Sequence, residues 1–164
     1  MDAGTGPGSV PRNSGFRVMA AAGLVVVLAA VSVIWVLVPR TAETPGVFRD
    51  GVSLTAAIAE ARESDRVVVA VATADWCGPC QAYKRGALAD GAVQSWLEAH
   101  SVPVMVDVTH EAPEDAAFLE IGPIPATYVI DGEGRIVGQT IGNTGTGELL
   151  SFLREHGNVG SDGG

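Results

Sequence analysis

The sequence is poor in the residues that build metal centres. It has two cysteines and three histidines among 164 residues. A structural zinc site needs four ligands, usually with a second Cys or His pair at short spacing, but His100, His110 and His156 lie far apart. Covalent haem needs a histidine directly after a C-x-x-C motif, and Gln81 occupies that position. These absences argue against zinc and exclude c-type haem. We therefore expect no metal cofactor, with Cu(I) on the cysteine pair alone as an alternative.

Positive charge is also scarce. Ten Lys and Arg residues stand against nineteen Asp and Glu residues, and the net charge is −9. Because nucleic acid binding requires a basic face, we expect no nucleic acid partner. The sequence contains no flavin or nicotinamide motif. Electrons for any redox reaction would therefore have to come from another protein.

One long run, residues 18–38, carries no charged side chain and no polar face. As a helix rising about 1.5 Å per residue it spans roughly 30 Å, the thickness of a bilayer's hydrocarbon core, so we predict a single transmembrane helix. A cleaved signal peptide is the alternative, but it needs small residues before the cut, where this chain has Arg40. Arg12 and Arg17 precede the run, which favours an extracytoplasmic position, periplasmic or cell-wall, for the rest of the chain.

Composition divides the chain further. We predict a disordered tail over 1–17, the transmembrane helix over 18–38, a linker over 39–50, a globular domain over 51–156 and a second disordered tail over 157–164. The two tails and the linker are rich in Gly, Pro and polar residues, which do not build a core.

Helical and strand patterns alternate within the globular part. They predict helices over 53–63, 91–100, 113–119 and 148–156, a helix from the cysteine motif to about 88, and strands over 66–73, 102–108, 126–130 and 135–141. The last two strands form a hairpin through the turn 131–134. Parallel crossovers followed by a hairpin predict an α/β domain, with a mixed sheet flanked by helices on both sides.

The two cysteines lie in the motif Trp76-Cys77-Gly78-Pro79-Cys80, after a buried strand and at the start of a helix. The N-terminus of a helix favours negative charge, so we expect a lowered pKa for the Cys77 thiol. The i, i+3 spacing brings both sulfurs to one helix face, where they can close a small disulfide ring. Cys80 lies one turn further in and is expected to be more buried. A purely structural disulfide is the alternative, but so small a ring restricts the unfolded chain little.

This motif resembles the active site of the thioredoxin family. Ile124 and Pro125, 45 positions after Cys80, resemble the family's cis-proline loop, and the likeness covers about 66–156. The segments 74–77 and 106–109 are similar to the C-terminal domain of DsbD-type thiol:disulfide interchange proteins, and 134–137 to membrane-tethered cytochrome c maturation thioredoxins.

The resemblance implies a thioredoxin-like fold and a set of roles. Cys77 would be the nucleophile and Cys80 the resolving thiol, with Trp76, Gly78 and Pro79 as active-site support and Trp76 as an apolar shelf. Ile124 and Pro125 would bind the substrate backbone. The implied function is a membrane-anchored thiol–disulfide oxidoreductase that reduces exported proteins and takes electrons from a membrane donor. A cytochrome c maturation thioredoxin, or a non-catalytic module that binds peptide or Cu(I), is the alternative.

The chain departs from the family at one position. Thioredoxins usually carry a buried aspartate six residues before the first cysteine, which helps to deprotonate the second, and Val71 stands there. We expect Asp75 to be a surface residue beside the motif rather than a replacement. The strand 102–108 offers no lysine.

Overall fold

The computed structural model describes residues 23–33, 41–49, 52–109 and 114–157. Residues 41–164 form one compact unit and residues 1–40 another. Of the predicted transmembrane helix 18–38, residues 23–33 are described, and they are helical. Among the described residues no helix has the length and apolar character to cross a membrane. The predicted tail 1–17 and nearly all of the predicted tail 157–164 lie outside the described residues.

Helices and strands alternate in the compact unit in the predicted order. They are α2 (Leu54–Ser64), β1 (Val67–Thr73), α3 (Gly78–Arg85), the 3-10 turn η1 (Ala87–Ala89), α4 (Gly91–His100), β2 (Ser101–Asp107), α5 (Glu114–Phe118), β3 (Ala126–Ile130), β4 (Ile136–Ile141) and α6 (Thr146–His156). Ser53 caps α2, because its side chain accepts the backbone N–H of Ala56 at 3.2 Å.

The four strands form one mixed sheet in the order β2-β1-β3-β4. β1 pairs with β2 in parallel, while β3 runs antiparallel to β1 and to β4. β1 is central and buried along its whole length, as the β-branched run 66–73 predicts. The predicted hairpin is β3–β4, with Gly134 at a φ of 82° in its turn. The mixed α/β architecture predicted from the sequence is therefore confirmed.

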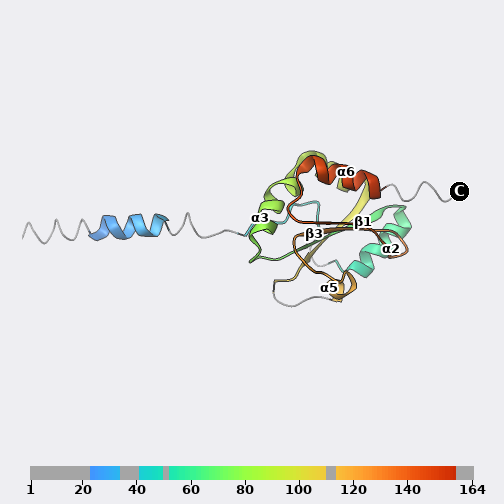
Figure 1. The fold of residues 1–164 in the computed structure, drawn as a ribbon, viewed down its shortest axis with the longest axis horizontal. Coiled ribbons are helices and arrows are strands. Elements are labelled where there is room, and N and C mark those ends of the chain that lie inside the picture. Colours follow the sequence, from blue (N-terminus) through green and yellow to red (C-terminus); the bar gives the residue numbers. More distant parts are fainter. Residues whose placement is uncertain (1–22, 34–40, 50–51, 110–113, 158–164) are drawn as a thin grey trace, which may run out of the picture. The chain divides into compact units, whose positions relative to one another are not determined.

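Helices cover both faces of the sheet (Figure 1). On one face, Val68, Ala70 and Ala72 of β1 pack against α2 and Leu119. On the other face, Val67, Val69 and Val71 pack against residues of α3, α4 and α6. Alternate side chains of a strand point to opposite faces, so β1 contributes to both cores. A third, smaller cluster of Ala74, Cys77 and Cys80 lies at the end of β1.

Two helix boundaries differ from the sequence prediction by more than one residue. The helix after the cysteine motif was expected to reach about residue 88, but α3 ends at Arg85 and η1 follows. Gly86 separates them with φ −96° and ψ −108°, which is not helical. The last helix begins at Thr146 rather than at residue 148, and Gly145 precedes it in an extended conformation. Neither difference moves the cysteine motif.

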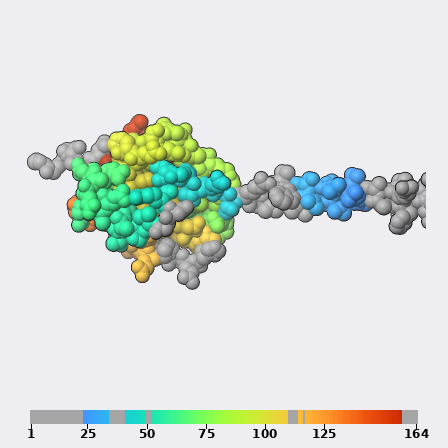
Figure 2. All heavy atoms as spheres, turned by 180° about the vertical axis from the view of Figure 1, so that it is seen from behind, coloured from blue at the N-terminus to red at the C-terminus, as the bar shows by residue number. Residues whose placement is uncertain are grey.

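Residues 41–49, which the sequence assigns to a linker, pack against the domain where they are described. Phe48 is buried in the core shared by α3, α4 and α6. Arg49 forms a parallel bridge with Val104 of β2 and an ion pair with Glu60 of α2 at 2.7 Å. In Figure 2 this cyan segment runs across the surface of the domain. The compact unit accordingly begins at Thr41.

Candidate active site

Cys77 and Cys80 form a disulfide at the start of α3, with 5.2 Å between their Cα atoms. Both sulfurs lie on one face of the helix, as the i, i+3 spacing predicts. Cys77 is 5% exposed and Cys80 is 1% exposed. The expected order of burial is thus observed, and Cys77 is the more exposed residue of the pair.

A backbone N–H at the start of α3 donates a hydrogen bond to the Cys77 sulfur. Cys77 is the N-cap residue in an extended conformation, and its Sγ accepts the backbone N–H of Cys80 at 3.2 Å. Pro79 fits the first turn because its missing N–H has no helical partner there. When the disulfide opens, the same N–H and the helix dipole favour a thiolate on Cys77 over a thiol.

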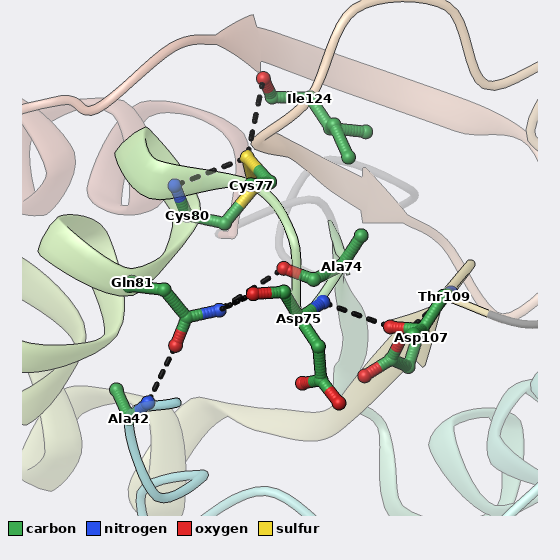
Figure 3. Close-up of a disulfide and its surroundings, with 9 residues drawn as sticks. All are labelled: Ala42, Ala74, Asp75, Cys77, Cys80, Gln81, Asp107, Thr109 and Ile124. Atoms are coloured by element: carbon green, nitrogen blue, oxygen red, sulfur yellow. Dashed lines mark hydrogen bonds between the residues drawn. A yellow bond between two sulfur atoms is a disulfide. The ribbon is translucent and has the colours of Figure 1, made fainter. Parts of the chain in front are cut away.

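The Ile124–Pro125 peptide bond is cis, as the resemblance implies. The Ile124 carbonyl oxygen lies 3.9 Å from the Cys77 sulfur (Figure 3). In the disulfide this sulfur has no hydrogen to donate, so the contact becomes a hydrogen bond only with the reduced thiol. Pro125 is buried, and its carbonyl accepts the N–H of Gly142 at 2.7 Å. The loop is therefore held directly against the cysteine pair.

The remaining residues of the motif face solvent. Trp76 is 70% exposed, and Gly78 and Pro79 are exposed as well. Trp76 therefore offers a large apolar surface next to the disulfide instead of being a partly buried packing residue. Ile141 at the end of β4 is 53% exposed and pairs with Ala126, the residue after Pro125. An approaching polypeptide would meet apolar side chains around the disulfide.

The loop that leads into the motif is fixed from the side of β2. The backbone N–H of Asp75 donates to Thr109 Oγ1 at 2.8 Å. Thr109 in turn donates its hydroxyl and its backbone N–H to the carboxylate of Asp107. The Asp75 side chain is exposed, as expected. In this arrangement the backbone of Asp75 is held in place while its carboxylate is directed away from the core.

The same loop is also fixed from α3, by a side chain that the sequence did not single out for this role. The buried side chain of Gln81 donates from Nε2 to the carbonyl of Ala74 at 3.0 Å and to that of Asp75 at 3.4 Å. Its Oε1 accepts the backbone N–H of Ala42 (Figure 3). The one signal in the sequence is position, since Gln81 lies four residues after Cys77 on the same helix face.

No buried carboxylate among the described residues takes the place of the missing aspartate beside the cysteines. Val71 is buried, with Tyr83 of α3 in the same core, and the Tyr83 hydroxyl lies 2.9 Å from Thr127 Oγ1. Burial raises the pKa of Tyr83 to about 12, although the bond to Thr127 works in the opposite direction. The phenol thus keeps its proton at neutral pH. Among the described residues the one buried carboxylate is Asp131, at the opposite end of β3 from Pro125.

The side chains in the described part of the chain provide no ready set of ligands for a metal ion. No group of three or more His, Cys, Asp or Glu side chains there is arranged to hold an ion. The cysteine pair is closed as a disulfide, and a thiolate, not a disulfide sulfur, is the form that binds metals. The pair in this structure has the geometry of a closed disulfide.

Comparisons with known proteins agree with this geometry. A family model described as thioredoxin-like matches residues 50–131. A thioredoxin from Thermus thermophilus is 26% identical, with 76% of this chain and 90% of that chain covered and a TM-score of 0.56. The C-terminal domain of Neisseria meningitidis DsbD, in its oxidised form, is also 26% identical, with 66% and 97% covered and a TM-score of 0.55.

A protein described as DsbH oxidoreductase shares the fold, at 19% identity and a TM-score of 0.54, with 71% of this chain and 90% of that chain covered. No curated protein matches the sequence. The described fold, the cysteine pair and the family match agree, and the chain belongs to the thioredoxin-like family, with a domain similar to that of DsbD.

Proposed function

We propose that this protein is a membrane-anchored reductase of disulfides in exported proteins. Its family and its Cys77–Cys80 disulfide support a thiol–disulfide oxidoreductase in general. The observation that carries the proposal is the position of Cys77. Cys77 is the more exposed residue of the pair, and its sulfur accepts an N–H at the start of α3 and lies against the Ile124 carbonyl. These are the requirements of a nucleophilic thiolate that receives an extended substrate.

The reaction begins with both cysteines reduced. The Cys77 thiolate attacks one sulfur of the substrate disulfide, the substrate S–S bond breaks, and the other substrate sulfur leaves as a thiolate that takes up a proton. Cys80 then loses its proton and attacks the Cys77 sulfur. The mixed disulfide breaks and the second substrate thiol is released. Two electrons have passed from the protein to its substrate, and the Cys77–Cys80 disulfide remains.

The reducing direction is supported by the dipeptide between the cysteines. Gly78-Pro79 is the dipeptide of reducing thioredoxins, whose potential is near −270 mV, against about −120 mV for a strong oxidant of the DsbA type. A reductase must be reduced again after each cycle. Since the chain carries no flavin or nicotinamide motif, we propose a membrane protein as the electron donor.

Anchoring and compartment belong to the same proposal. They are supported by the uncharged run 18–38 and by the positive charges that precede it. Protease accessibility in intact cells with a permeable outer envelope tests them. Degradation of the domain without lysis of the cytoplasmic membrane is expected, and protection until lysis would contradict an extracytoplasmic domain.

Reduction of insulin by the full chain, solubilised in detergent and supplied with dithiothreitol, tests the activity. We expect precipitation of the insulin B chain well above the dithiothreitol background, and loss of that excess in Cys77→Ser. The potential, measured by equilibration with dithiothreitol, should lie near that of thioredoxins. A rate equal to the background, unchanged by Cys77→Ser, would refute the proposed activity.

The substrate class is tested by trapping in whole cells. Cys80→Ser leaves the first step intact and removes the second, so the mixed disulfide through Cys77 accumulates. Exported proteins in the trapped complexes, absent from a Cys77→Ser/Cys80→Ser control, are the expected result. Complexes made up of cytoplasmic proteins would contradict the proposed compartment and substrates.

A further inference from the structure

The N-terminal segment of the domain, residues 41–49, reaches the active-site end of α3 with its first residues, 41–43. Ala42 donates its backbone N–H to Gln81, which directly follows Cys80 in the helix. Further along, the segment is held by the buried Phe48 and by the bridge from Arg49 to β2. It is thus attached at both ends, and its first attachment is next to the redox site.

The chemistry of Gln81 explains why an amide is needed. The side chain faces one N–H and two carbonyl oxygens, so it must accept at one atom and donate at the other. A carboxylate could not donate to the carbonyls of Ala74 and Asp75, and an ammonium could not accept from Ala42. A buried polar side chain that loses its partners is costly. The three bonds therefore stabilise one another.

The carbonyl of Ala74 connects this network to the nucleophile. It accepts the backbone N–H of Cys77 at 3.2 Å as well as the amide of Gln81. The next peptide is held from the opposite side, because Asp75 donates its N–H to Thr109. Figure 3 shows Gln81 between the N-terminal segment and the loop that leads to Cys77.

We propose that Gln81 is a positioning residue, and that residues 41–43 act through Gln81 to help orient Cys77 in the redox site. Gln81 fixes the loop that carries Cys77, and Ala42 fixes Gln81. The orientation of Cys77 toward the Ile124 carbonyl then depends on where the N-terminal segment lies. This inference rests on the proposed function for its catalytic consequence, while its structural part stands independently of it.

Two pairs of variants in the full chain test the network. One pair tests the amide of Gln81, and the other tests the bond from Ala42 to Gln81. Gln81→Met keeps the length of the side chain and removes its amide. Gln94→Met is the matched control, because Gln94 also donates from Nε2 to a carbonyl, that of Leu88 at 3.3 Å, but on α4. Ala42→Pro removes the N–H that Gln81 accepts, and Ala42→Gly keeps it.

Amide hydrogen exchange in the oxidised protein is the first measurement, because it needs no turnover. Ala42→Pro removes one neutral hydrogen bond, which should speed exchange at the Cys77 amide about fivefold. Gln81→Met removes all three bonds of the side chain and should speed this exchange at least as much. The double variant should exchange no faster than Gln81→Met, and the amides of β1 should be unaffected. Gln94→Met and Ala42→Gly should match the wild type at Cys77.

Insulin reduction is the second measurement. Gln81→Met and Ala42→Pro should both lower kcat with KM unchanged, Gln81→Met at least as much as Ala42→Pro, since they affect the orientation of Cys77 and not the surface that meets the substrate. Wild-type exchange at Cys77 in Ala42→Pro would overturn the role of the N-terminal segment. Faster exchange throughout β1 would show that Gln81 is merely structural. If the wild type reduces no disulfide but exchange responds as expected, the proposed function fails and the network stands.

Discussion

Replacement of Val71 by aspartate tests the most unusual feature of this site. Val71 is 1% exposed in the centre of β1 and packs among apolar side chains of α3, α4 and α6. Its neighbour in register on β3 is Thr127, whose hydroxyl is already paired with Tyr83. A carboxyl at position 71 would therefore enter a core built of apolar side chains.

The cost of Val71→Asp has two parts. Loss of the buried valine side chain removes roughly 1.5 kcal/mol. Desolvation keeps the buried carboxyl neutral, while the unfolded chain ionises it with a pKa of about 3.9. At about 1.36 kcal/mol per pH unit, that difference approaches roughly 4 kcal/mol at pH 7 and about 1.5 kcal/mol at pH 5. The raised folded pKa means that the folded state binds more protons, so stability falls as the pH rises from about 4 to 7.

Urea unfolding of the full chain at pH 5, 6 and 7 measures this dependence. The free energy of unfolding of Val71→Asp, relative to the wild type, should fall by about 2 to 3 kcal/mol over that range. Val71→Asn has a similar shape and no ionisable group, so its deficit should stay constant. Equal deficits for the aspartate variant at pH 5 and pH 7 would refute the reasoning, because they would show that a charged carboxylate is solvated at this position.

Three other predictions concern stability away from the cysteines. Burial acts to raise the pKa of Asp131, but hydrogen bonds and charge from Arg135 outweigh it and hold this pKa below its usual value. Stability from this carboxylate is therefore complete above about pH 4 and lost as the pH falls further. In urea unfolding, Asp131→Asn should lose less stability than the wild type as the pH falls below about 4. The same dependence of the unfolding free energy on pH in both proteins would contradict this role of Asp131. Tyr128 has a buried hydroxyl without a hydrogen-bond partner among the described residues, so Tyr128→Phe should raise stability by about 1 kcal/mol in thermal unfolding. A loss of stability would instead reveal a partner. A Cβ at Gly138 would lie 2.6 Å from Cγ of His156, so Gly138→Ala should cost about 1 to 3 kcal/mol. Adding His156→Ala should recover much of that cost, and no recovery would show that another contact is responsible.

Local patterns in the sequence were sufficient to predict most of the fold. Six apolar residues in β1 predicted a strand buried on both faces, and the predicted start of the first helix of the domain, residue 53, lies one residue before that of α2. The break at Gly86 was missed, because its non-helical backbone is one of several conformations open to glycine. The early start of α6 at Thr146 was missed as well, since helix ends are set by local hydrogen bonds that sequence patterns resolve poorly.

The candidate site also contains residues that the sequence identifies and residues that it does not. The cysteines, their neighbours and Pro125 are recognised because they form contiguous motifs with a known resemblance. Gln81 was read only as the absence of a haem-attaching histidine, and the carbonyls that it binds cannot be identified from a side-chain pattern. Ala42 was assigned to a linker, because a backbone N–H leaves no signal in the sequence.

The sequence alone therefore determined the cysteine pair, its place between a strand and a helix, and the presence of Val71 where thioredoxins usually carry an aspartate. These properties depend on residue identity and on spacing along the chain. Tertiary structure decided which cysteine is more exposed, that Trp76 is exposed, and that Ile124, Gln81 and Ala42 meet around the same loop. Those properties depend on hydrogen bonds and packing between residues as many as 47 positions apart, and such contacts exist only after the chain has folded.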